Sequence, residues 1–123
     1  MPLTHDPSPR LILGYTNAGI RLVDRMVTTS ALITPAAVAD WPVRSVAELD
    51  RAQIEPVLAL GAEVVLLATG ARQEFPRYEV LAAAARAGIG LEVMDVGAAC
   101  RTYNVLVAED RPVALALILP GAP

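Results

Sequence analysis

The second half of the chain alternates apolar runs with helical segments, and this pattern limits the possible folds more than any other feature. Strands are predicted at residues 63–68, which are expected to be buried on both faces, and at residues 89–94 and 112–119, and helices at residues 76–86 and 97–110. Pro76 at the start of the first helix and Gly88 after its end are typical of these positions. Strands that alternate with helices imply crossover connections. We therefore expect an α/β domain with a mainly parallel sheet covered by helices.

The first third of the chain indicates antiparallel β structure. Residues 1–10 contain three prolines and no periodicity, so we expect a flexible lead-in before a single domain over residues 11–123. Residues 11–34 are rich in Val, Ile, Thr and Leu, and the pair Asp24-Arg25 between two apolar runs predicts a hairpin. This part of the chain is therefore interpreted as a β meander.

A connection and a short helix are expected between the meander and the first buried strand. Residues 35–44 are interpreted as the connection. Ser45 and Glu48 have the spacing of a capping box, and Asp50 is an alternative N-cap for a helix that ends before Gly61. A proline within this helix indicates that it is short, kinked or broken in two.

The composition excludes several classes of chemistry. The chain has 123 residues, of which 54% are hydrophobic and 19% charged, as expected for one globular domain. All ten basic residues are arginine, which rules out a Schiff-base lysine. The net charge of −3 and the lack of a basic run argue against nucleic acid as a partner. The one histidine, His5, lies in the lead-in, so we expect neither a metal site nor a cofactor.

The same features suggest the compartment. There is one cysteine, so no disulfide can form within the chain, and a reducing environment is expected. Residues 1–10 lack the pattern of a signal peptide, and the longest apolar runs are too short to cross a bilayer. We therefore expect a cytoplasmic protein that does not insert into membranes.

Two loops at strand ends could form a ligand-binding cleft. Thr69, Gly70 and Arg72 follow one predicted strand and Asp95 follows the next, and ligands of open α/β sheets bind beyond such carboxyl ends. Backbone N–H groups at Gly70 could hold an anion, although a tight exit turn explains the same residues. Asp95 could act as a general base, but the N-cap of the following helix is the simpler role.

The last helix begins with three further candidates. Cys100 lies in the first turn beside Arg101, where a thiol pKa can be lowered, although a cysteine that follows two alanines is also typical of a small buried side chain. Arg101 and Asn104 are three residues apart and could together hold a ligand carboxylate or a partner peptide. In the alternative interpretation, Arg101 pairs with Asp95 or Glu109 and Asn104 bonds to a loop backbone.

Several segments taken together resemble a known family. The most specific segments are residues 67–70, 88–95, 98–106 and 109–111. Over residues 12–120 the chain resembles the family of small uncharacterised domains that includes mitochondrial respiratory complex I assembly factor 3 and stand-alone bacterial and archaeal relatives. The resemblance implies a three-layer α/β fold, with a central mixed, mostly parallel sheet and an extra N-terminal β-hairpin. It also implies a non-enzymatic role through protein contacts. The chain departs from the family pattern at Ala68 and Val96, where glycine and threonine are usual.

These observations leave two functions open. The first is a non-catalytic protein-interaction or assembly module, which the shortage of histidines, lysines and carboxylate pairs favours. Its partner is unknown; a membrane-complex subunit and a second copy of the chain are both candidates. The alternative is a small-molecule or anion binding domain, or a weak enzyme. Its candidate site residues are Thr69, Gly70, Arg72, Asp95, Cys100, Arg101 and Asn104.

Overall fold

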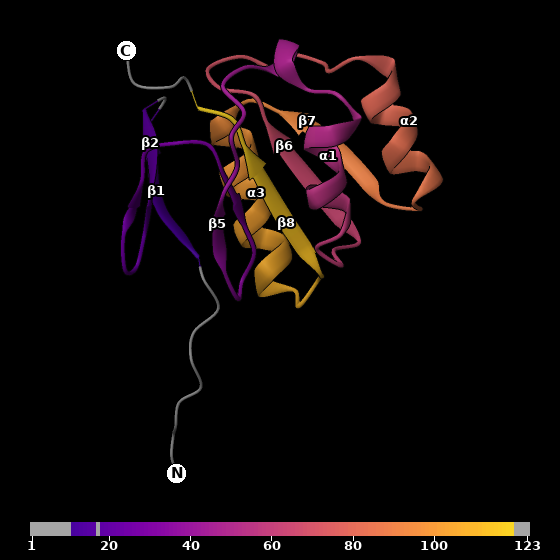
Figure 1. Ribbon diagram of the computed structural model, residues 1–123. Coiled ribbons are helices and arrows are strands. Elements are labelled where there is room, and N and C mark those ends of the chain that lie inside the picture. Colours follow the sequence, from indigo (N-terminus) through magenta and orange to yellow (C-terminus); the bar gives the residue numbers. More distant parts are fainter. Residues whose placement is uncertain (1–10, 17, 120–123) are drawn as a thin grey trace.

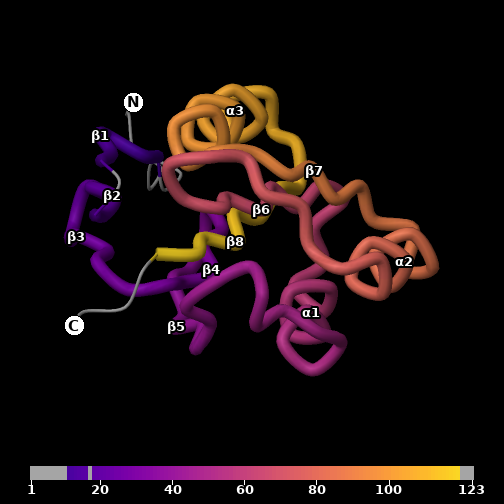
Figure 2. Tube along the Cα trace, turned by 90° about the horizontal axis from the view of Figure 1, so that it is seen from above, coloured from indigo at the N-terminus to yellow at the C-terminus, as the bar shows by residue number. Residues whose placement is uncertain are grey.

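The computed structural model describes residues 11–16 and 18–119, so the expected lead-in over residues 1–10 lies outside the described residues. A five-stranded sheet forms the middle layer (Figure 1). Helices α1 (Arg51–Leu58) and α2 (Tyr78–Arg86) cover one face, and α3 (Val96–Ala108) covers the other beside a small three-stranded sheet (Figure 2). The predicted three-layer α/β fold is confirmed.

The parallel part of the sheet has the predicted connectivity. Strand β6 (Val64–Ala68) lies between β8 (Val113–Leu117) and β7 (Gly90–Met94), and both neighbours run parallel to it. Every residue of β8 is buried, because helices cover one face of this strand and α3 with the small sheet cover the other. Strands that are buried on both faces give continuous apolar runs instead of alternation. For this reason β6 and β8 could be located from the sequence with only small differences at their ends, and β7, which is only partly buried, was located from its place between two helical segments.

The small sheet confirms the expected hairpin. Strands β1 (Ile12–Thr16), β2 (Gly19–Leu22) and β3 (Met26–Val27) pair antiparallel in that order. The turn predicted at Asp24-Arg25 joins β2 to β3. One face of this sheet packs into the core through alternate residues, of which Ile20 is fully buried.

The meander prediction was wrong beyond β3. Strand β4 (Ala31–Ile33) does not join the small sheet and instead pairs antiparallel with β8, the middle strand of the central sheet. All three residues of β4 are buried, and a strand buried on both faces needs a place inside the layered core. The predicted connection over residues 35–44 contains strand β5 (Val38–Asp40), which pairs with β4 at the edge of the sheet. Its mostly exposed residues carry no apolar alternation, so the sequence did not reveal it.

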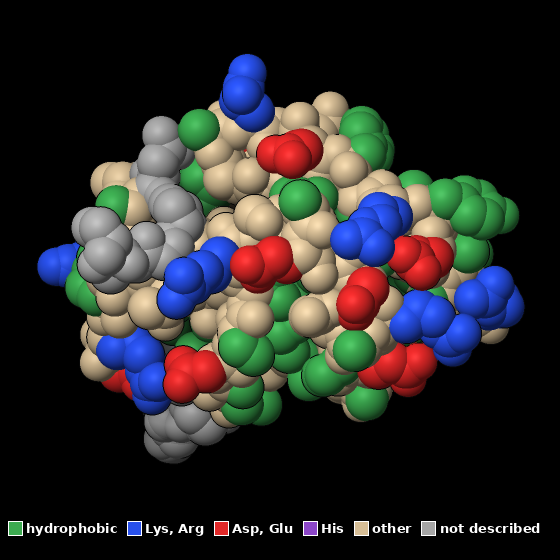
Figure 3. Space-filling view, turned by 45° about the horizontal axis from the view of Figure 1, so that its top comes forward, with side chains coloured by type: hydrophobic (Ala, Val, Ile, Leu, Met, Phe, Trp, Pro, Cys, Tyr) green, Lys and Arg blue, Asp and Glu red, His purple; other side chains and the backbone are tan. Residues whose placement is uncertain are grey.

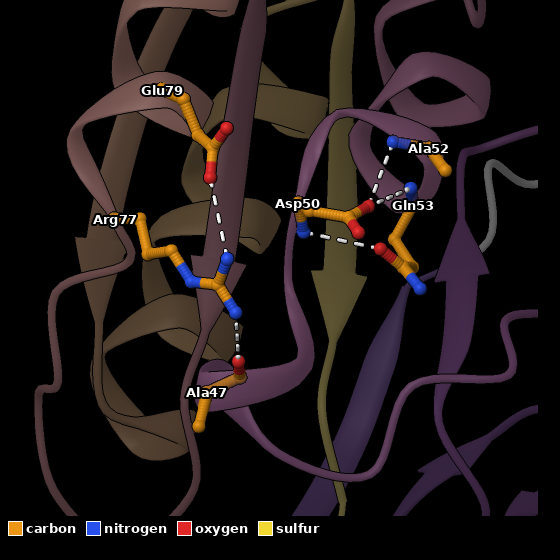
Figure 4. Close-up of polar contacts among 6 residues, drawn as sticks. All are labelled: Ala47, Asp50, Ala52, Gln53, Arg77 and Glu79. Carbon is orange, nitrogen blue, oxygen red and sulfur yellow. Dashed lines mark hydrogen bonds and ion pairs between the residues drawn. The ribbon is translucent and has the colours of Figure 1, made fainter.

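The first helix is capped by the second of the two candidates. The Asp50 carboxylate accepts hydrogen bonds from the backbone of Ala52 and Gln53, and the Gln53 side chain accepts one from the Asp50 N–H (Figure 4). Ser45 precedes only a 3₁₀ turn, η1 (Val46–Glu48), and makes no side-chain cap bond. As predicted, α1 is short, with Pro56 inside it.

Most of the core is aliphatic, and only some of the aromatic residues are buried in it. The chain has five aromatic residues, of which Trp41 and Tyr103 are buried. The other three side chains remain 40% (Tyr15), 63% (Phe75) and 82% (Tyr78) exposed. Large apolar side chains left in solvent are more informative about binding than a buried core is.

Candidate functional site

Thr69 organises the loop between β6 and α2. It is buried at the end of β6, and its hydroxyl donates to the Arg72 carbonyl at 2.6 Å, with the Met94 carbonyl 3.2 Å away. The same oxygen accepts from the Glu74 N–H at 3.1 Å. The hydroxyl is therefore occupied by backbone groups of its own loop and of β7.

Gly70 and Asp95 join the two strand-end loops. The Val96 N–H donates to the Gly70 carbonyl at 2.8 Å, so the loops meet as predicted. Gly70 has a φ of +97°, which favours glycine and explains why a tight turn forms here. The Asp95 carboxylate accepts from the Ala98 N–H at 2.9 Å and caps α3. Both residues therefore have the simpler structural role that the sequence allowed.

Cys100 lies inside the core and not at a surface. Its side chain is only 1% exposed and belongs to the apolar cluster beneath α3. Burial raises the pKa of the thiol from 9.0 to about 12, although the positive charge of Arg101 lowers it in part. A thiolate nucleophile is therefore strongly disfavoured at neutral pH.

Asn104 and Arg101 hold the small sheet against α3. The Asn104 amide donates to the Ile12 carbonyl at 2.8 Å and accepts from the Ile12 N–H at 2.9 Å. Arg101 donates to the Tyr15 hydroxyl. The Tyr15 ring lies so close to Gly97 that a Cβ there would be 3.0 Å from a ring carbon. Gly97, Arg101 and Asn104 fall on one face of the helix, which receives β1.

Taken together, the seven candidates form two groups. Thr69, Gly70, Arg72 and Asp95 surround the junction of the strand-end loops, whereas Arg101 and Asn104 point toward β1 and Cys100 lies beneath them. The pairing of Arg101 with Asp95 or Glu109, which the alternative interpretation proposed, is absent among residues 11–16 and 18–119. The use of these residues as a ligand site stays a prediction.

Replacing Arg101 with alanine tests whether this side chain is mainly structural. The guanidinium is exposed and, within the described part of the chain, makes one hydrogen bond, to the exposed Tyr15 hydroxyl. We expect the free energy of unfolding to fall by less than about 1 kcal/mol, as is usual for surface substitutions. Thermal unfolding of both proteins measures this, and a loss of several kcal/mol would identify Arg101 as a strut for the small sheet.

The sequence did not point to Arg44, which lies between two hollows at the carboxyl-end edge of the sheet. The smaller hollow, of about 230 Å³, is lined by Thr69, Gly70 and Glu74 besides Arg44. The larger, of about 500 Å³, lies between Arg44, Trp41 and the end of β8. Figure 3, with this edge turned toward the viewer, shows acidic and basic side chains interspersed and no patch of one sign. Within the described residues, no group of three His, Cys, Asp or Glu side chains could hold a metal ion.

The exposed aromatic residues at the loop from Thr69 to Arg77 were not among the candidates predicted from the sequence. The loop presents Phe75 and, at the first residue of α2, Tyr78. The signal available in the sequence was two aromatic residues beside Pro76, in a chain with few others. Among the described residues, no helix is long and apolar enough to span a bilayer.

Comparisons with known proteins agree on the family. A family model described as "Protein of unknown function (DUF498/DUF598)" matches residues 12–118. The zebrafish (Danio rerio) NADH dehydrogenase (ubiquinone) 1 alpha subcomplex assembly factor 3 is 34% identical over 91% of this chain and 66% of its own length. A 13 kDa major membrane protein of Francisella tularensis is 32% identical over 62% of each chain. An NMR structure from Xanthomonas campestris has a TM-score of 0.86 at 40% identity, and covers 100% of this chain and 96% of that one.

Proposed function

We propose that this chain, which belongs to the DUF498/DUF598 family, is a non-catalytic protein-interaction module of the assembly-factor type. The zebrafish relative carries the name of an NADH dehydrogenase assembly factor, and this chain spans 66% of its length. The similarity therefore concerns only that part of the relative. An assembly role requires a surface that binds another protein, and such a surface can be sought among the described residues.

The arrangement of polar groups supports a role without turnover. The side chains that the sequence suggested for chemistry make hydrogen bonds to the protein's own backbone, as Thr69, Asp95 and Asn104 do. A general base or nucleophile needs a group that is free to contact substrate in the right protonation state. Cys100, with its raised pKa and its burial, does not meet this condition.

The observation that carries the proposal is the exposure of Phe75, on a braced loop, and of Tyr78, at the start of the helix that follows this loop. Three bonds brace the loop. The Thr69 hydroxyl donates to the Arg72 carbonyl, and the Gln73 amide donates to the Val93 carbonyl at 2.8 Å. The third, from the Arg77 guanidinium to the Ala47 carbonyl at 3.0 Å, is drawn in Figure 4. A loop that is ordered before binding loses less conformational entropy when a partner arrives.

Aromatic residues also suit the energetics of an interface. Burying a large apolar side chain stabilises a complex by roughly 1.5–3 kcal/mol. Tyr and Arg are enriched among interface residues that dominate affinity, and Arg77 lies between the two aromatic positions. Phe75, on the braced loop, and Tyr78, at the start of α2, therefore offer two neighbouring anchors.

A photo-crosslinking phenylalanine analogue at position 78 tests the proposal in living cells. We expect a discrete crosslinked product whose partner can be identified by mass spectrometry. The double variant Phe75→Ala/Tyr78→Ala should then reduce capture of that same partner tenfold or more. Because both side chains are exposed, its melting temperature should stay nearly unchanged.

Met26 gives the matched control for this experiment. It is 57% exposed on the small sheet, so an analogue there samples a different apolar surface. Equal crosslinking from positions 26 and 78 would indicate nonspecific contact. Full capture of the partner by the double variant would contradict the proposal.

The hollow beside Arg44 favours the second candidate function, an anion-binding domain. Among the described residues no ion pair engages the Arg44 guanidinium, and a guanidinium can hold a carboxylate or phosphate through two parallel bonds. Glu74 also lines this hollow, and its negative charge opposes an anion. A thermal-shift screen with inorganic phosphate and small carboxylates tests this function. A rise in melting temperature that Arg44→Ala abolishes would support it, because a ligand of the native state stabilises that state.

A further inference from the structure

Strand β7 has an open outer edge. The Gly90 N–H donates to the Glu63 carbonyl, and the Met94 carbonyl accepts from the Thr69 N–H, so these two residues bond toward β6. Residues along a parallel strand alternate between the two sides. The backbone groups of Leu91 and Val93 therefore point away from β6, at the edge of the sheet.

One of these four outward groups is already occupied. The Gln73 side chain donates to the Val93 carbonyl at 2.8 Å, in the manner of a neighbouring strand. Between described residues, no hydrogen bond occupies the Val93 N–H or the N–H and carbonyl of Leu91. Three of the four outward main-chain groups are thus available to pair with an extended chain. The loop that braces it is the same loop that presents Phe75.

We propose that β7 accepts an extended segment of a partner protein as an added strand, with a basic residue facing Glu92. Main-chain hydrogen bonds would supply affinity, as in other cases of strand addition. Glu92 is exposed in the middle of β7 and makes no ion pair among the described residues, so its charge favours a basic residue opposite. This inference rests on the proposed interaction function, because it assigns a binding mode to the partner.

A second copy of the chain is a poorer occupant of this edge. The antiparallel self-pairing that uses the whole of β7 places Glu92 directly opposite Glu92, and like charges in that position are destabilising. Strand β5, at the opposite edge, is also a weaker site because it has only three residues, against five in β7. The charge of Glu92 thus favours a different, basic chain as the occupant, and the lengths of the two strands favour the β7 edge over the β5 edge.

A synthetic probe tests the edge without knowledge of the partner. The probe is a seven-residue peptide of alternating arginine and valine with blocked ends, and its control replaces arginine with glutamate. In NMR titrations at physiological salt, we expect the arginine peptide to shift the amide signals of Leu91 and Val93. Hydrogen exchange of these two amides should slow tenfold or more. Shifts centred elsewhere, or equal binding of the glutamate peptide, would overturn the proposal.

Two variants sharpen the result. Leu91→Pro removes an outward N–H without removing a bond to β6, and proline is tolerated at such edge positions. We expect it to weaken binding of the arginine peptide at least tenfold, whereas Leu91→Val should not. If Leu91→Pro does not fold, Glu92→Arg still tests the proposal. With this variant, the glutamate peptide should bind better than the arginine peptide. Asp40→Arg makes the same change of charge on β5 and should leave the preference intact.

The outcomes also separate this inference from the function on which it rests. The peptide experiment does not involve Phe75 or Tyr78, and the crosslinking experiment does not involve the β7 edge. A crosslinked partner together with no peptide binding would leave the interaction module standing and reject strand addition. Peptide binding without a crosslinked partner would reject the aromatic loop as the main contact.

Discussion

Cys100 should react with thiol reagents roughly a thousandfold more slowly in the native protein than in the unfolded chain. Burial raises the pKa of this thiol from 9.0 to about 12. Since only the thiolate reacts, three pKa units lower the reactive fraction by roughly a thousandfold at neutral pH. The measurement is the labelling rate of native protein beside that of the protein in denaturant. Rapid stoichiometric labelling under native conditions would contradict it and would revive a nucleophilic role.

The same pKa shift predicts how stability depends on pH. The unfolded thiol loses its proton above about pH 9, whereas the folded thiol keeps it until about pH 12. The unfolded state therefore binds fewer protons in this range, and the free energy of unfolding falls as pH rises from about 9 to about 12. Cys100→Ala should flatten this part of the stability curve. An unchanged slope would mean that other groups cause the alkaline loss.

The parallel half of the fold was predictable because its signals are local. The apolar runs that became β6 and β8 are continuous, and the helices on either side of β7 have ordinary end signals. Gly88 has a φ of +72°, which favours glycine after the end of α2. Such features depend on a few neighbouring residues, so a single sequence is enough to reveal them.

The antiparallel half was less predictable because its pairing is not local. Nothing near Ala31–Ile33 tells whether this segment stays with β3 or crosses to β8, some eighty residues later in the sequence. The burial of all three residues settles the question, but only the folded protein shows that burial. Strand β5 is recognisable only from its partner, since its own residues are mostly exposed.

The candidate site residues form two groups instead of one, again because some of their contacts are between residues far apart in the sequence. The loops after β6 and β7 meet, as the sequence suggested, because the two strands are parallel neighbours. The sequence also pointed to unusual polar residues in α3, where most of a helix that covers a sheet is apolar. The sequence could not show that β1 supplies the hydrogen-bond partners of these polar residues. Ile12, the partner of Asn104, lies 92 residues away in the sequence. A cluster of polar residues on a core-facing helix can thus reflect a docked strand instead of a ligand.

Asn104→Ala should lower the free energy of unfolding by about 2–4 kcal/mol, because it removes both bonds between α3 and the backbone of Ile12. Ile12 is 5% exposed, and each buried backbone group left without a partner costs roughly 1–3 kcal/mol. Chemical denaturation measures the loss. Hydrogen exchange should also show faster exchange of the Ile12 amide than of the amides in β6.

Asn104→Asp is the matched control. Aspartate has nearly the same shape and can still accept from the Ile12 N–H, but its ionised carboxylate cannot donate to the Ile12 carbonyl and repels it instead. We therefore expect Asn104→Asp to be destabilised at neutral pH and to recover part of the loss when the carboxyl is protonated, because a protonated carboxyl can donate. If both variants keep the stability of the original protein, the Asn104 amide does not anchor the small sheet. Its side chain would then be free to serve a partner or ligand.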